Sequence, residues 1–327
     1  MGVEFVAVGG RVQSLCWEGD ELVDFAGGER RWRPDGTSSC SLVGFGSRFD
    51  RVELSPSGRF AVVSEDRGTK ALLLEGAEVV RELDRSYYHS ADFDYPVALG
   101  RLPDGREIVV HCPDSYEVLQ IDDLCSGQRL TVGDRTPQDV FHSRLSVGPD
   151  GRYLLSAGWL WHPYGIARVY DLAQALADPS TLDGDGLLPL SSTGAEVGSA
   201  CWLDGDRIAV ATTDEVLDDE EVPDPGPRQL GVWSVSGQRW LHRSVVEHPL
   251  GTLLARGDQV VSLYDHPRLI DTGTGAVLAQ WPEVKVGQQE GSFGCGGVRT
   301  PPVAVSADGS RLAVAQDGGI AVMELPR

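Results

Sequence analysis

The sequence predicts an all-β fold in which seven similar antiparallel sheets form one closed ring. Three observations support this: a tight polar turn recurs seven times, an apolar strand follows each turn, and a further strand follows in several copies. Repetition at a period of about 40–50 residues is typical of propeller blades, each built from four strands. We therefore expect residues 1–327 to form a single domain, a seven-bladed β-propeller with four-stranded blades. The first repeat is divergent, and a different assignment of it would give six or eight blades.

The recurring turn joins two apolar segments and carries a glycine at a fixed place. It reads WEGDEL, SPSGRF, LPDGRE, GPDGRY, LDGDRI, ARGDQV and SADGSR. Its glycines are Gly19, Gly58, Gly105, Gly151, Gly205, Gly257 and Gly309. Successive glycines are 39 to 54 residues apart, and 37 residues separate the last from the first across the joined ends. These spacings leave room for four strands in each repeat.

The segment after each turn is rich in β-branched and aliphatic residues. The seven copies are ELVDFA, FAVVSE, EIVVHC, YLLSAG, IAVATT, VVSLYD and LAVAQD. Such near-continuous apolar runs are typical of strands covered on both faces, as inner strands are between neighbouring blades. A third strand follows in several repeats, as EVLQID, ARVYDL, LGVWSV, RLIDTG and IAVMEL.

The last repeat, at residues 300–327, holds only three predicted strands, so its outer edge lacks a partner. The apolar segment at residues 3–9 precedes the first inner strand, QSLCWE. We expect it to supply the missing fourth strand and to close the ring.

Several strand pairs resemble a known repeat superfamily. LSVGPDGRYLLSAG with ARVYDL, and VAVSADGSRLAVAQ with IAVMEL, are similar to WD40-like and related bacterial seven-bladed β-propeller repeats, over nearly the whole chain. The Trp-Asp dipeptide is only approximated, by VWS at 232–234, VYD at 169–171 and LID at 269–271, and the Gly-His dipeptide is absent. The exact repeat class therefore stays open. The resemblance implies a non-catalytic scaffold that binds a protein or peptide.

Composition narrows the class of partner. The net charge is −21, from 49 acidic and 28 basic residues, and such a surface repels nucleic acid and anionic membranes. No apolar run approaches the roughly 20 residues that cross a bilayer, and no secretory signal pattern begins the chain, so we expect a cytoplasmic protein. Lysine occurs only at positions 70 and 285 and asparagine not at all, which favours a GC-rich bacterial genome.

The six cysteines lie far apart and form no Cys-x-x-Cys pair, so we expect free core thiols and no cofactor. They are Cys16, Cys40, Cys112, Cys125, Cys201 and Cys295.

Nearly all of the long connections fall on one face of the predicted ring. They are residues 84–96, 132–143, 158–165, 213–228 and 281–302. The other face has short turns, except at residues 171–186, where DLAQALADP predicts a short helix that begins after Asp171 and ends before Pro179. Loops longer than the fold requires are often functional, so we place the binding site on the long-loop face.

Aromatic, histidine and acidic residues gather on these loops, as in protein-binding hot spots. The predicted partner-binding residues are Tyr87, Tyr88, His89, Asp92, Asp94, His142, Trp159, Trp161, His162 and Tyr164. An alternative is that Trp159 and Trp161 pack beneath a neighbouring loop.

A second hypothesis is a metal-dependent hydrolase, similar to lactonase-like or phytase-like propellers, with a cation at the channel mouth held by Asp92 and Asp94. The acidic run at 214–221 offers carboxylates for Ca²⁺ but lacks EF-hand spacing, and the aspartates at 89–94 are also common turn formers. The glycine-rich run at 291–297 lacks the ending of a phosphate loop, and no Gly-x-Ser-x-Gly motif occurs. We predict no catalytic residue.

A third hypothesis is that the protein is a structural subunit of a larger complex.

Overall fold

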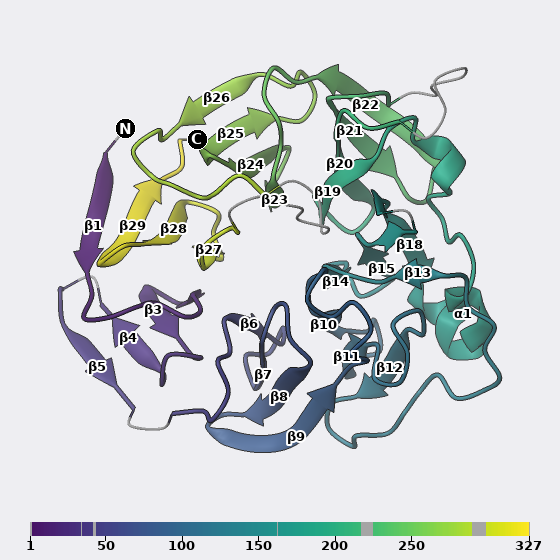
Figure 1. The fold of residues 1–327 in the computed structure, drawn as a ribbon, viewed down its shortest axis with the longest axis horizontal. Coiled ribbons are helices and arrows are strands. Elements are labelled where there is room, and N and C mark those ends of the chain that lie inside the picture. The colour runs from purple at the N-terminus through teal and green to yellow at the C-terminus, as the bar shows by residue number, and fades with distance from the viewer. Residues whose placement is uncertain are drawn as a thin grey trace.

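Seven antiparallel sheets are arranged around a common axis in the computed structural model, and an eighth, smaller sheet lies among the long loops (Figure 1). The structure describes residues 2–33, 35–41, 44–161, 163–216, 225–289 and 299–326. The prediction of an all-β ring with seven blades is confirmed.

Four blades are each built from four consecutive strands. The first two contain β2 (Cys16–Glu18), β3 (Glu21–Asp24), β4 (Arg30–Trp32) and β5 (Ser38–Cys40), then β6 (Arg51–Leu54), β7 (Phe60–Ser64), β8 (Lys70–Glu75) and β9 (Glu78–Asp84). The fifth and sixth contain β19 (Val197–Trp202), β20 (Arg207–Thr212), β21 (Gln229–Ser234) and β22 (Arg239–Val245), then β23 (Thr252–Arg256), β24 (Gln259–Tyr264), β25 (His266–Asp271) and β26 (Val277–Gln280).

Two blades have three strands instead of the expected four. The third contains β10 (Val97–Arg101), β11 (Glu107–His111) and β12 (Gln120–Asp123), and the fourth contains β14 (Leu145–Val147), β15 (Tyr153–Ser156) and β18 (Arg168–Asp171). The third blade has only a single bridge, Asp122 to Arg129, at the outer position. In the fourth, the chain turns into a helix directly after β18, so no outer strand forms there.

That helix, α1 (Leu172–Ala177), confirms the prediction for residues 171–179. The Asp171 side chain accepts a hydrogen bond from the Gln174 amide, and the 3₁₀ helix η1 (Pro179–Leu182) follows at once. A second 3₁₀ helix, η2 (Leu190–Ser192), completes this connection. Among the described residues, no helix has the length and apolar character that a membrane crossing requires.

The ring closes between the two ends of the chain. Strand β1 (Val3–Ala7) pairs antiparallel with β29 (Gly319–Glu324), from Val3 opposite Met323 to Ala7 opposite Gly319. The same blade continues with β28 (Arg311–Gln316) and β27 (Val303–Val305). This confirms that the N-terminal strand completes the last blade (Figure 1).

The second strand of each blade supplies most of the core between blades. Every residue of β7, β11 and β15 is buried, as their continuous apolar sequences predict. Six of the seven repeated turn glycines have positive φ, between 59° and 91°, a backbone conformation that favours glycine. Gly205 is the exception.

The prediction that the cysteines are core thiols is correct for only some of them. Cys112 is buried, whereas Cys40 and Cys125 are exposed because they lie in an outer strand and in a turn. Cys295 and the glycine-rich run at 291–297 lie outside the described residues.

Candidate functional site

The small eighth sheet brings two of the long loops together. It consists of β13 (Val140–Phe141), β16 (Trp159–Leu160) and β17 (Tyr164–Gly165), and it pairs Phe141 with Trp159. Their rings stack with centroids 3.8 Å apart and planes within 3°. Tyr116 stacks on Phe141 at 4.1 Å, and Phe93 meets it edge-on at 5.5 Å. We call Phe93, Phe141 and Trp159, all buried, the aromatic base.

Exposed aromatic rings rest on this base. Tyr88 is 53% exposed and Trp161 is 55% exposed. The Tyr88 ring lies 5.8 Å from that of Phe141, and the Trp161 ring lies 5.9 Å from that of Trp159 and 5.2 Å from that of His89. We call Tyr88, His89, Tyr116 and Trp161 the aromatic patch. Tyr87, the next residue in the chain, is 82% exposed.

Carboxylates border the aromatic patch. Asp92 Oδ2 lies 2.7 Å from His89 Nδ1. The Tyr116 hydroxyl donates a hydrogen bond of 2.7 Å to Asp139 Oδ1. Burial, together with the nearby Asp139 carboxylate, raises the pKa of the Tyr116 phenol. The patch therefore combines flat apolar rings with negative charge at its border.

Three residues predicted to contact a partner are buried and cannot do so directly. Trp159 lies beneath the surface in the aromatic base, and Tyr164 packs against Val140 and Ile166. His142 places Nδ1 2.9 Å from Ser156 Oγ, and burial lowers its pKa to about 3. The sequence predicted that these residues lie in open loops, because two-residue strands such as β13, β16 and β17 are too short to show the alternating pattern of a strand.

The other predicted residues separate into three groups. Tyr87, Tyr88 and Trp161 are exposed, and His89 and Asp92 are partly exposed beside them. Asp94 lies deeper, in an ion pair. His162 lies outside the described residues. The hypothesis that the tryptophans pack beneath a loop is thus correct for Trp159 but wrong for Trp161.

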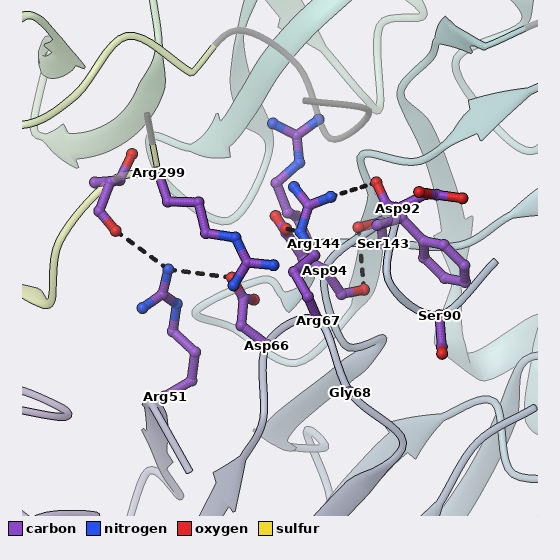
Figure 2. A network of polar contacts seen from close by, with 12 residues as sticks. Arg51, Asp66, Arg67, Gly68, Ser90, Asp92, Asp94, Ser143, Arg144 and Arg299 are labelled. Carbon is purple, nitrogen blue, oxygen red and sulfur yellow. Dashed lines mark hydrogen bonds and ion pairs between the residues drawn. The ribbon is translucent and has the colours of Figure 1, made fainter. Parts of the chain in front are cut away.

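A polar network holds the loop at residues 84–96 in place (Figure 2). Arg67 Nε lies 2.9 Å from Asp94 Oδ1, and Arg67 Nη1 donates to the backbone carbonyl of Asp92. Ser143, which follows β13, donates through Oγ to the carbonyl of Asp94 at 3.3 Å. Arg144 donates to the carbonyls of Ala157 at 3.2 Å and Gly198 at 2.8 Å. The network therefore links both loops of the patch to neighbouring blades.

Arg85 holds the same loop from the other side. It donates to the backbone carbonyls of Gly68 at 2.7 Å, Phe93 at 3.0 Å and Asp94 at 3.1 Å, and to that of Ser90. Its guanidinium lies 4.5 Å from the centre of the Phe93 ring. Burial lowers its pKa to about 10, which leaves it charged near neutral pH. Arg85 thus fixes the loop that carries Tyr87, Tyr88 and His89.

A cavity of about 290 Å³ opens beside this network at the centre of the ring. It is lined by acidic and basic side chains, among them Arg51, Glu53, Asp66, Asp94 and Arg144. Burial is the largest influence on the Asp94 carboxyl and raises its pKa, whereas Arg67 and Arg144 oppose that rise. Burial also raises the pKa of Glu53 to about 8.

The structure gives no support for a metal held by Asp92 and Asp94. Asp94 is paired with Arg67 and Asp92 with His89, and no three His, Cys, Asp or Glu side chains of the described residues are grouped to hold an ion. Of the acidic run at 214–221, residues 217–221 lie outside the described part, while Asp214 pairs with Arg228. The hydrolase hypothesis stays a prediction.

Sequence reasoning missed the residues that support the patch. Phe93, Tyr116 and Phe141 are single aromatics without a repeat, and their stacking depends on three separate loops. Arg67 and Arg85 were missed because a lone arginine next to a strand carries no signal of the carbonyls it will bind. Phe93, Asp139 and Phe141 lie inside the long loops at residues 84–96 and 132–143, and this position was the one signal that could have identified them.

Comparison with known proteins supports the predicted fold. No family model matches the chain, and no curated protein matches it. A chain in the solved structure "Crystal Structure of Mitotic Checkpoint Complex" superposes with a TM-score of 0.62 at 12% sequence identity, covering 100% of this chain and 91% of that one. Together with the ring of antiparallel sheets and its closure, this likeness shows a β-propeller fold over the full chain.

Proposed function

We propose that this propeller binds a protein or peptide partner on its long-loop face, through Tyr87, Tyr88 and Trp161. The observation that carries the proposal is that these three large aromatic side chains are each more than half exposed. Exposed aromatics cost solvation free energy in the free protein, and clusters of them characterise binding hot spots.

The way the patch is supported strengthens the proposal. Tyr88 and Trp161 lie on a base of stacked rings, and Arg85 fixes the backbone of the loop before the patch. A surface whose side chains are already ordered loses less conformational entropy on binding. The structurally similar chain belongs to a complex, as its title states, which agrees with a docking function for this fold.

A co-purification experiment tests this function. The tagged protein is compared with the Tyr87→Ala/Tyr88→Ala/Trp161→Ala variant in lysate of the cells that make it. Phe5→Ala is the matched control, because Phe5 is a comparably exposed aromatic on β1, outside the long-loop face. We expect one protein to co-purify with wild type and Phe5→Ala but not with the triple variant. Equal recovery with all three proteins would refute the assignment of the surface.

A further inference from the structure

Two carboxylates at the border of the aromatic patch are accessible to a ligand. The Asp92 side chain is 43% exposed and Asp139 is exposed as well. One oxygen of Asp92 lies within hydrogen-bond distance of the His89 imidazole, and one oxygen of Asp139 accepts a hydrogen bond from the Tyr116 hydroxyl. Among the described residues, no further hydrogen bond or ion pair is made by either carboxylate, so the second oxygen of each remains for a ligand.

Three basic side chains on segments close to the patch form ion pairs with other carboxylates. The Arg67 side chain is only 8% exposed and pairs with Asp94, and Arg129 pairs with Asp114 at 3.3 Å. Lys70, on the neighbouring strand β8, pairs with Asp84 at 2.8 Å. None of these three cations forms an ion pair with the Asp92 or Asp139 carboxylate.

The aromatic rings attract positive charge for a separate reason. The face of a tyrosine or tryptophan ring carries negative electrostatic potential, so a guanidinium or ammonium group binds favourably above it. Tyr88 and Trp161 both expose more than half of their surface. The net charge of −21 adds a long-range attraction for basic partners and a repulsion for acidic ones.

From these three observations we infer that the partner inserts a cationic side chain, arginine or lysine, over Tyr88 and Trp161, with Asp92 and Asp139 as its counter-charges. The inference rests on the proposed function and specifies its partner as a basic segment. A purely apolar partner would leave both carboxylates without a role, and an acidic segment would be repelled.

The test uses two peptides that differ only in charge. The probe is acetyl-Gly-Arg-Gly-Arg-Gly-amide, and its control replaces each arginine with citrulline, which has nearly the same shape but no charge. Binding is followed by saturation-transfer NMR during titration of the purified full chain. We expect the arginine peptide to bind at least fivefold more tightly than the citrulline peptide, with the difference shrinking as NaCl rises from about 50 to 500 mM.

Variants locate the binding. Trp161→Ala and the Asp92→Asn/Asp139→Asn pair should each weaken the arginine peptide about fivefold or more. Asp104→Asn, an exposed aspartate in a tight turn on the opposite face, should leave it unchanged. The asparagine variants retain the size of the side chains, so loss of folding is not expected to mimic their effect.

Two results would overturn the inference: equal binding of both peptides, or arginine-peptide binding that none of the site variants weakens. If co-purification still depends on Tyr87, Tyr88 and Trp161 in that case, the docking function stands and only the cationic partner is wrong. If co-purification is also independent of these residues, the docking function itself fails.

Discussion

Replacing Arg85 with methionine should loosen the loop that carries the aromatic patch while the ring remains closed. The side chain donates to four backbone carbonyls, of Gly68, Ser90, Phe93 and Asp94. At about 1.5 kcal/mol for each hydrogen bond from a charged donor, the four together contribute about 6 kcal/mol. Methionine retains part of the contact with the Phe93 ring, and water reaches some of the freed carbonyls. We therefore expect a loss of about 3–5 kcal/mol in the free energy of unfolding.

Two measurements check the Arg85→Met prediction. Urea unfolding gives the change in stability, and amide hydrogen exchange shows whether protection falls at residues 86–95 more than in β7 or β11. Arg152→Met is the matched control, because Arg152 also lies over an aromatic ring, 5.0 Å from the centre of Tyr153, but is exposed and binds no backbone carbonyl. If Arg85→Met unfolds like Arg152→Met and exchange at 86–95 is unchanged, the loop does not depend on Arg85 and the reasoning is wrong.

Three further substitutions test other parts of the structure. Glu53→Gln keeps an acceptor for the Leu99 amide but removes a carboxyl whose pKa burial raises to about 8. The Glu53 carboxyl therefore keeps its proton in the folded wild type up to a higher pH than in the unfolded chain, where it releases the proton near pH 4.3. The free energy of unfolding of wild type, relative to that of the variant, should fall by at most about 1.4 kcal/mol per pH unit as pH rises from about 4.3 to 8. An equal difference between the two proteins in urea unfolding at pH 5 and pH 8 would contradict this. Asp183→Ala leaves the buried Arg135 without its counter-charge and should cost about 3–5 kcal/mol, whereas loss of the exposed Asp104–Arg106 pair should change urea unfolding little. Gly158→Ala would place Cβ 2.1 Å from the Phe141 carbonyl oxygen. It should lower the free energy of unfolding by about 1–3 kcal/mol and alter the near-ultraviolet circular dichroism of the stacked rings. Gly184→Ala, whose Cβ would have no atom within 4 Å, should have neither effect.

The ring could be predicted from sequence because its signals are local and repeated. The turn glycines and the apolar second strands recur in every blade, so an error in one copy is corrected by the other six. The three-stranded third and fourth blades were missed for the same reason, since the average repeat says nothing about an individual outer strand. In the fourth blade, the helix that begins after Asp171 stands where the average repeat has its outer strand.

The candidate site was predictable only as a face and a set of loops. Sequence identified Tyr87, Tyr88 and Trp161 as loop aromatics, and the structure exposes all three. It did not distinguish Trp161 from Trp159, two positions earlier, because that difference depends on a two-residue strand and on Phe141, 18 positions away from Trp159. Burial at such a site is decided by contacts between loops, which one sequence does not reveal.

The pairing of β1 with β29 also has a consequence during synthesis. Strand β1 is made before every other strand of the ring, and its partner β29 follows more than 300 residues later. At a synthesis rate of about 5–20 residues per second, roughly 15–60 s pass between the synthesis of β1 and that of its partner strand β29. Through that interval β1 has no pairing partner, so the ring cannot close until β29 has been made.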